Sequence, residues 1–308
     1  MASERQRRLR RRLTLAAPLV GLLAAEAVVR EAGWAPLPIP RQEGPNFRDS
    51  DCPVERYVNV PGAELSIPFV DALGRPPRVV RATINADGFR GPRVPRERTP
   101  GVARIACVGD RHTFGWGVDD GETWPAVLAR ELEGVEVINA GVNGYDAEQE
   151  SAFCRREVLA WQPDLVLWQF FLNDAGMREM PLQPGQELGG LLALARPGRG
   201  GAVGTLRARW RTLDLVLDRL WKRGALRLYG DARAVYYRED AEGWQRFRAA
   251  VLAARDACVE RDMGFAMLLV PFLDGRRGAL AGGEAHAFVA RFCAEQDIPV
   301  LDARPLLA

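Results

Sequence analysis

Five short apolar runs, each separated by a helix-like stretch, most restrict what this chain can fold into. The runs cover residues 104–108, 135–138, 165–172, 264–270 and 298–301. Amphipathic patterns typical of helices lie between them, at residues 122–133, 146–161, 205–223, 241–261 and 284–296. Alternation of strands and helices at these lengths predicts an α/β fold with a parallel sheet and helices on both faces. The nearly continuous apolar run at 165–172 is typical of a strand buried on both faces.

Glycine and polar residues that could build a site follow the first three predicted strands. Gly109, Asp110 and Arg111 come after the first strand, Gly141 after the second and Asn173 after the third. Ligands of parallel α/β sheets bind where the carboxyl ends of the strands meet, so these residues are expected to lie together. Each also has a purely structural interpretation, because glycine and asparagine suit turns and aspartate suits a helix cap.

Three motifs at these positions resemble blocks of a known hydrolase family. They are GDRHTFGWGV at 109–118, NAGVNG at 139–144 and Asn173-Asp174. In order and spacing they resemble the SGNH, or GDSL-like, hydrolases, a family of esterases and acyl hydrolases, over roughly residues 79–308. The resemblance implies a flavodoxin-like three-layer fold with a parallel five-stranded sheet. It also implies an oxyanion hole made by the N–H groups of Arg111 and Gly141 and the side chain of Asn173.

Two departures from the family pattern bear on activity. Arg111 stands where the family has its serine nucleophile, and a guanidinium stays charged at any working pH and cannot attack an ester. The family's Asp-x-x-His block, which supplies the base, is absent before the sequence reaches Ala308. Loss of a triad nucleophile costs on the order of 10⁶ in turnover. The sequence therefore predicts an inactive protein whose candidate site is Asp110, Arg111, Gly141 and Asn173.

Three functions remain open from the sequence. The chain could be an exported protein that resembles an ester (O-acyl) hydrolase but is catalytically inactive. It could be a truncated representative of an active O-acyl esterase, or a non-catalytic envelope module that binds glycan or acyl groups. The expected ligand is an acylated glycan or a lipid, and no cofactor or metal is expected. The net charge is +2 and the arginines alternate with carboxylates, so the charge gives no case for nucleic acid as a partner.

The N-terminus carries six arginines within its first twelve residues, and an uncharged run from Leu13 to Ala25 comes next. A basic flank before an apolar run favours a cytoplasmic N-terminus and export of the rest of the chain. The run is close to the lower length limit for a membrane span, and Ala25-Glu26-Ala27 resembles a signal-peptide cleavage site. A membrane anchor, a cleaved signal and a peripheral amphipathic segment all remain open. In the first two cases the bulk of the chain lies outside the cytoplasm.

The sequence divides into three expected parts. Residues 1–30 form the basic N-terminus with the anchor or signal segment, and residues 31–100 form a linker followed by a small β-rich segment. Residues 101–308 form the SGNH hydrolase-like domain, with a lid-like insertion at 176–238. Strand-like runs at 65–70 and 79–84, followed by turn residues, mark the β-rich segment.

The histidines and cysteines are expected to be structural. His112 occupies a slot that varies in the family, and His286 is expected on a partly exposed helix face. No spacing among the cysteines matches a metal site, so they are expected to be small buried apolar residues, with one disulfide left open. The five are Cys52, Cys107, Cys154, Cys258 and Cys293.

Overall fold

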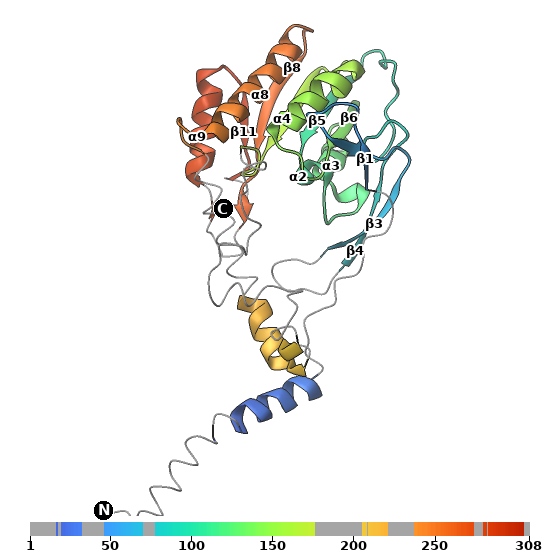
Figure 1. Ribbon diagram of the computed structural model, residues 1–308. Coiled ribbons are helices and arrows are strands. Elements are labelled where there is room, and N and C mark those ends of the chain that lie inside the picture. The colour runs from blue at the N-terminus through green and yellow to red at the C-terminus, as the bar shows by residue number, and fades with distance from the viewer. Residues whose placement is uncertain are drawn as a thin grey trace, which may run out of the picture. The chain divides into compact units, whose positions relative to one another are not determined.

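The computed structural model (Figure 1) describes residues 17, 20–32, 46–69, 78–175, 205–207, 209–220, 237–273, 280–281 and 283–304. The chain forms two compact units. One comprises Met1–Pro38 and Leu182–Leu226, and the other comprises Ile39–Pro181 and Arg227–Ala308. Most of the expected lid-like insertion at 176–238 lies outside the described residues.

The larger unit is built on a five-stranded parallel sheet, which confirms the predicted α/β fold. Its strands are β5 (Ala103–Gly109), β6 (Val135–Gly141), β7 (Leu165–Phe170), β8 (Gly264–Leu269) and β11 (Val300–Asp302). Their order in space is β11-β8-β7-β5-β6. Since β6 lies outside β5 and the later strands continue on the other side, this is the flavodoxin-like order. A further antiparallel pair joins β9 (Phe272–Leu273) to β10 (Leu280–Ala281).

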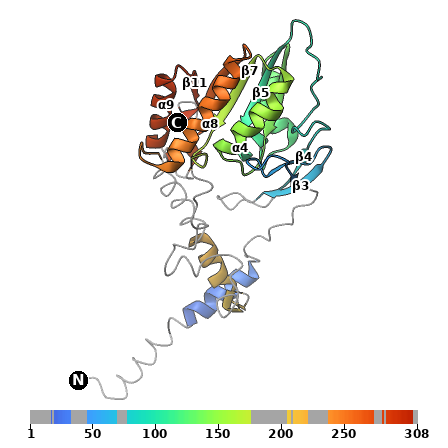
Figure 2. The same ribbon diagram turned by 45° about the horizontal axis from the view of Figure 1, so that its top comes forward.

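Three helices lie side by side over one face of the sheet, as Figure 2 shows. They are α4 (Ala147–Phe153), α8 (Glu242–Val259) and α9 (Gly283–Glu295). The Ser151 hydroxyl donates to the Ala250 carbonyl over 2.8 Å and joins α4 to α8. The Trp244 ring packs edge-on to the Phe292 ring, 5.4 Å between centroids, and joins α8 to α9. These contacts bury the aromatic side chains that cover the sheet.

Local hydrogen bonding explains where α3 (Trp124–Glu131) starts and why the helix predicted at 146–161 is divided. The 3-10 turn η1 (Asp120–Glu122) leads into α3, which packs against β6 and starts where Thr123 accepts from the N–H of Ala126. The helix predicted at 146–161 is divided, because α4 continues as the π-helical η2 (Cys154–Val158) and the 3-10 turn η3 (Leu159–Trp161). A π turn inserts an extra residue per turn, which a 3.6-residue pattern does not reveal.

Two antiparallel hairpins precede the sheet. In the first, β1 (Phe47–Asp49) pairs with β2 (Tyr57–Asn59). In the second, β3 (Glu64–Phe69) pairs with β4 (Arg78–Thr83), close to the predicted runs. The strand β1 was not predicted, because its residues fall in the expected linker. Ring packing explains it, since the centroids of Phe47 and Tyr57 lie 4.5 Å apart.

The smaller unit contains a helix over residues 20–31 and another over 211–220. The Glu26 carboxylate accepts the backbone N–H groups of Arg211 and Thr212, at 3.0 and 2.9 Å. The hydrogen bond from Thr212 contributes most to lowering the pKa of Glu26 to about 2. Within the described parts of the chain, no helix combines the length and the apolar character needed to cross a membrane.

Candidate active site

The loops expected to carry the site meet at the carboxyl edge of the sheet. The short helix α2 (Arg111–Phe114) begins directly after β5, and Gly109 at the end of β5 pairs in register with Gly141 at the end of β6. The Val142 N–H donates to the Gly109 carbonyl over 3.0 Å, which ties the first loop to the second. The third loop, which holds Asn173, joins them where the Ala147 N–H donates to the Asp174 carbonyl over 3.3 Å.

Asp110 caps α2 from a fully buried position. Its Oδ1 accepts the backbone N–H of His112 over 2.9 Å and lies 2.9 Å from Nδ1 of the same residue. Burial acts to raise the pKa of Asp110, but His112 and then Arg111 outweigh it and hold that pKa below its usual value. A carboxylate is therefore the stable form, and it orients the His112 ring as an aspartate orients a catalytic histidine.

Arg111 opens α2 at the position expected for a nucleophile. Its guanidinium carbon lies 5.4 Å from the centroid of the Phe171 ring, within the range of a cation–π contact. The His112 ring packs on the same phenyl ring, with 3.9 Å between centroids. Phe171 thus contacts the side chains of both Arg111 and His112, and no serine stands at the position expected for the nucleophile.

Gly141 ends β6, and its backbone N–H is the group expected to be an oxyanion donor. Its N–H donates to Oδ1 of Asn139 over 3.1 Å, so this group is directed at a protein acceptor instead of an empty oxyanion position. The physical reason is local, because an asparagine side chain readily accepts from the backbone two residues further on. A Cβ atom at Gly141 would lie 2.1 Å from the nitrogen of Phe114. The glycine is therefore required for α2 to approach β6.

Asn173 is buried and its amide is also directed at the protein. Its Nδ2 donates to the carbonyl of Tyr145 over 3.5 Å, a long and weak hydrogen bond. The neighbouring Asp174 closes the turn, because its carboxylate accepts the Phe171 N–H over 2.8 Å. The structure therefore brings together all four predicted residues, but aims the Gly141 N–H and one N–H of Asn173 at protein acceptors.

Two groups behind this edge were not predicted. The Thr113 hydroxyl donates to Oε1 of Gln169 over 3.0 Å beneath α2. Glu150 of α4 is buried, and burial, followed by the charges of Asp174 and Asp110, raises its pKa well above the usual value. The only sequence signal is a glutamate on the apolar face of a predicted helix, which does not indicate what it faces.

His286 is fully buried in α9, so the expectation of a partly exposed histidine was wrong. Its ring packs edge-on against Phe170 at 5.6 Å, whereas Arg111 and His112 contact the next residue, Phe171. Burial, assisted by Arg304, lowers the pKa of His286 to about 4. It is therefore neutral at physiological pH.

No cluster of three or more metal-ligating side chains occurs among the described residues. The five cysteines are free thiols, and four of them are buried.

The sequence model of the GDSL-like lipase/acylhydrolase family matches residues 107–308. No curated protein sequence matches the chain. Among solved structures, the chain is similar to AlinE4, an SGNH-hydrolase family esterase, at 16% identity over 66% of this chain and 77% of that one, with a TM-score of 0.38. A lipolytic G-D-S-L family protein from Veillonella parvula DSM 2008 is 15% identical over 65% of this chain and 78% of that one, with a TM-score of 0.37. The acetyl xylan esterase AlAXEase is 13% identical over 66% of this chain and 79% of that one, with a TM-score of 0.37.

Proposed function

We propose that this chain, which belongs to the GDSL-like lipase/acylhydrolase family, uses the family fold to hold an acylated ligand without hydrolysing it. The observation that carries the proposal is Arg111 at the first position of α2, stacked over Phe171. Ester hydrolysis through an acyl-enzyme needs a nucleophile, a base and donors for the developing oxyanion. The geometry of this edge argues against a nucleophile and against preorganised oxyanion donors.

The nucleophile is the first deficiency. The guanidinium of Arg111 has no lone pair for attack and cannot be deprotonated under working conditions. His112 is oriented by Asp110 as a catalytic base would be. However, Arg111, which stands at the nucleophile position, offers no hydroxyl for it to activate. A histidine without a nucleophile supports binding of a polar group more readily than covalent catalysis.

The oxyanion donors are the second deficiency. The Gly141 N–H already donates to Asn139, and one of the two N–H groups of the Asn173 amide donates to Tyr145. An oxyanion would have to displace Asn139 from the single N–H of Gly141, whereas catalysis relies on donors that are preorganised. Removal of a single oxyanion donor typically costs about 10²–10³ in turnover. Substitution of Arg111 alone would therefore leave a poor catalyst.

The first prediction concerns turnover of p-nitrophenyl acetate by the purified chain. We expect no hydrolysis above a heat-denatured control and no labelling by a fluorophosphonate, which reacts with activated serines, because Arg111 cannot form an acyl-enzyme. Arg111→Ser should gain little activity by itself. Arg111→Ser joined to a family-like Asp-x-x-His segment after Ala308 should gain measurable activity. Arg130→Ser, at an exposed arginine of α3, is the matched control.

Burst kinetics with the unaltered chain would show that an acyl-enzyme forms and would overturn the proposal. Near-family rates from Arg111→Ser alone would show that a base is already in place, with His112 as the first candidate.

Binding of an ester ligand is tested separately by NMR titration with ethyl acetate. The amide signals of Gly141 and of the Asn173 side chain should shift, and unchanged spectra would contradict binding at this edge.

We also propose that the part of the chain after residue 30 is exported, with the N-terminal segment as a membrane anchor or a cleaved signal. The support is the cluster of arginines before the uncharged run at 13–25. A C-terminal reporter that is active only after export should give signal, and a cytoplasm-only reporter should not. Replacement of the N-terminal arginines by glutamate should reduce export. Cytoplasmic signal alone would rule the proposal out.

A further inference from the structure

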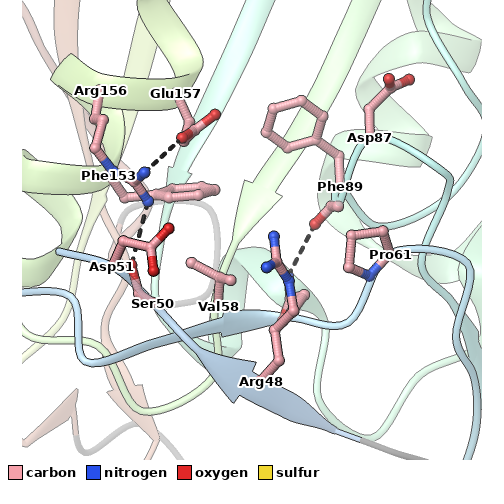
Figure 3. A pocket seen from close by; sticks show the side chains of 12 residues that line it. Arg48, Ser50, Asp51, Val58, Pro61, Asp87, Phe89, Phe153, Arg156 and Glu157 are labelled. Atoms are coloured by element: carbon pink, nitrogen blue, oxygen red, sulfur yellow. Dashed lines mark hydrogen bonds and ion pairs between the residues drawn. The ribbon is translucent and has the colours of Figure 1, made fainter.

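A pocket lies between the first hairpin, the turn at 85–89 and the π-helical η2. It is a depression of about 90 Å³ that opens to solvent, which is several times the volume that one water molecule needs. Figure 3 shows Arg156 and Glu157 beside Phe153 on one side, Phe89 and Pro61 on the other, and Arg48 reaching up from β1.

Some charged groups of this pocket are already paired with other residues of the protein. Arg156 is bound to Glu55 with 2.8 Å between Nε and Oε1, and to Glu157 at 2.9 Å. Asp87 receives two hydrogen bonds from Arg93, at 2.6 and 3.1 Å. These side chains are neutralised by neighbours, so a ligand would gain little from displacing those partners.

Three polar groups of the lining have no such partner. Arg48 and Asp51 are exposed and make no side-chain ion pair or hydrogen bond within the described residues. The Oδ1 atom of Asn59 is buried and accepts no hydrogen bond, although Nδ2 of the same side chain donates to the Gly88 and Gly141 carbonyls at 3.3 and 3.2 Å. A buried acceptor without a donor has lost its hydrogen bonds to water and gained none in return, so a donor supplied by a ligand is favoured there.

The apolar part of the lining is formed by Val58, Phe89 and Phe153, which are nearly buried. The two phenyl rings meet edge-on, with 6.2 Å between centroids. The pocket thus combines a small apolar patch with one unpaired donor group and two unpaired acceptor groups. A ligand that fits needs an apolar face and several groups that both donate and accept.

These requirements exclude several ligand classes. An anion would be attracted by Arg48 but repelled by Asp51, and a cation would be attracted by Asp51 but repelled by Arg48. An alkyl chain would leave the Oδ1 atom of Asn59 without a donor. A hydroxyl group donates and accepts at once, and a sugar ring carries several hydroxyls around a carbon face. We infer that this pocket binds a neutral sugar residue, with its hydroxyls on Arg48, Asp51 and Asn59.

The inference does not depend on Arg111 or on ester chemistry. Asn59 nonetheless connects the pocket to the candidate active site, because its Nδ2 donates to the carbonyl of Gly141. A sugar residue bound here would hold the side chain of Asn59 and, through it, the end of β6. The pocket would therefore place a glycan beside the edge where the acylated ligand is proposed to bind.

The test is calorimetric titration and saturation-transfer NMR on the full-length chain. The probes are methyl β-D-glucopyranoside and methyl α-D-mannopyranoside, with glycerol, sodium acetate and alanine as controls. We expect at least one glycoside to bind, and Arg48→Ala and Asp51→Ala each to raise its Kd about fivefold or more, as expected for one lost hydrogen bond. Both residues are exposed, so neither substitution should unfold the chain. Arg130→Ala, at an exposed position of α3, should leave the Kd unchanged.

Several results would overturn the inference. They are failure of both glycosides to bind, equal binding of glycerol, preferential binding of acetate or alanine, and glycoside binding that neither Arg48→Ala nor Asp51→Ala weakens. A chain that hydrolyses p-nitrophenyl acetate but still binds a glycoside in this way would contradict the proposed function and leave the sugar pocket intact.

Discussion

At the residue scale, the candidate site depends on a contact that only glycine permits. A Cβ atom at Gly141 would lie 2.1 Å from the backbone nitrogen of Phe114 and 2.6 Å from the carbonyl carbon of Thr113. Backbone atoms of a packed helix cannot move aside as the end of a flexible side chain can. The fit of α2 against β6 therefore rests on the absence of a single methyl group.

We predict that Gly141→Ala lowers the free energy of unfolding by about 3 kcal/mol or more, at the upper end of the cost of overpacking a core. Urea unfolding measures the change. Gly121→Ala is the matched control, because a Cβ at Gly121 meets nothing within 4 Å. It should change stability by less than about 0.5 kcal/mol. Equal midpoints for the two variants would show that α2 does not pack closely against β6.

At the element scale, one buried carboxylate anchors the first hairpin. The Glu55 side chain is fully buried and is bound by Arg156, whose side chain is partly exposed. The Ser50 hydroxyl donates to the same carboxylate over 2.6 Å, and Gln149 of α4 donates to the Glu55 carbonyl over 2.8 Å. The hairpin is therefore part of the folded unit, although the sequence of its first strand indicates a linker.

This pair should respond unequally to removal of its two members. Arg156→Met strands the Glu55 charge in the interior, so we expect a loss of about 3–5 kcal/mol in unfolding free energy. Addition of Glu55→Gln to Arg156→Met should recover part of that loss, because the buried charge is gone. Urea unfolding of both variants checks this, with Arg130→Met as the exposed control. A double variant less stable than Arg156→Met would show that the charge of Glu55 is not the source of the cost.

At the scale of the whole molecule, buried ionisable groups should limit stability on both sides of neutral pH. The pKa of His286 falls from 6.5 to about 4 on folding. The folded state therefore favours the neutral ring, and its stability is complete above pH 6.5 and declines as the pH falls toward 4. At 1.36 kcal/mol per pKa unit, this decline amounts to about 3 kcal/mol.

We predict that His286→Leu removes this part of the acid sensitivity. The measurement is the free energy of unfolding by urea at intervals from pH 7 to pH 4. A variant that loses stability as steeply as the unaltered chain would show that other groups cause the decline. Glu150 should act in the opposite direction, because its raised pKa means that stability falls as the pH rises above about 4.5. Glu150→Gln should therefore stabilise the chain at pH 7.

The sequence by itself determined the order of the five strands of the parallel sheet and of the longer helices between them, and the positions of Asp110, Arg111, Gly141 and Asn173 at strand ends. It could do so because hydrophobic periodicity and turn chemistry are local properties. Strand β7, for example, begins at Leu165 as predicted and ends at Phe170.

Only the tertiary structure decided what these residues meet. The hydrogen bond from Gly141 to Asn139, the full burial of His286 and the pairing of β1 with β2 all depend on which groups face one another after folding. Arg156, which binds Glu55, and Gly141, which binds Asn59, each lie more than eighty residues away in the sequence. No local pattern encodes such partners, because they arise when distant segments are buried against each other and their polar groups must find hydrogen bonds within the protein.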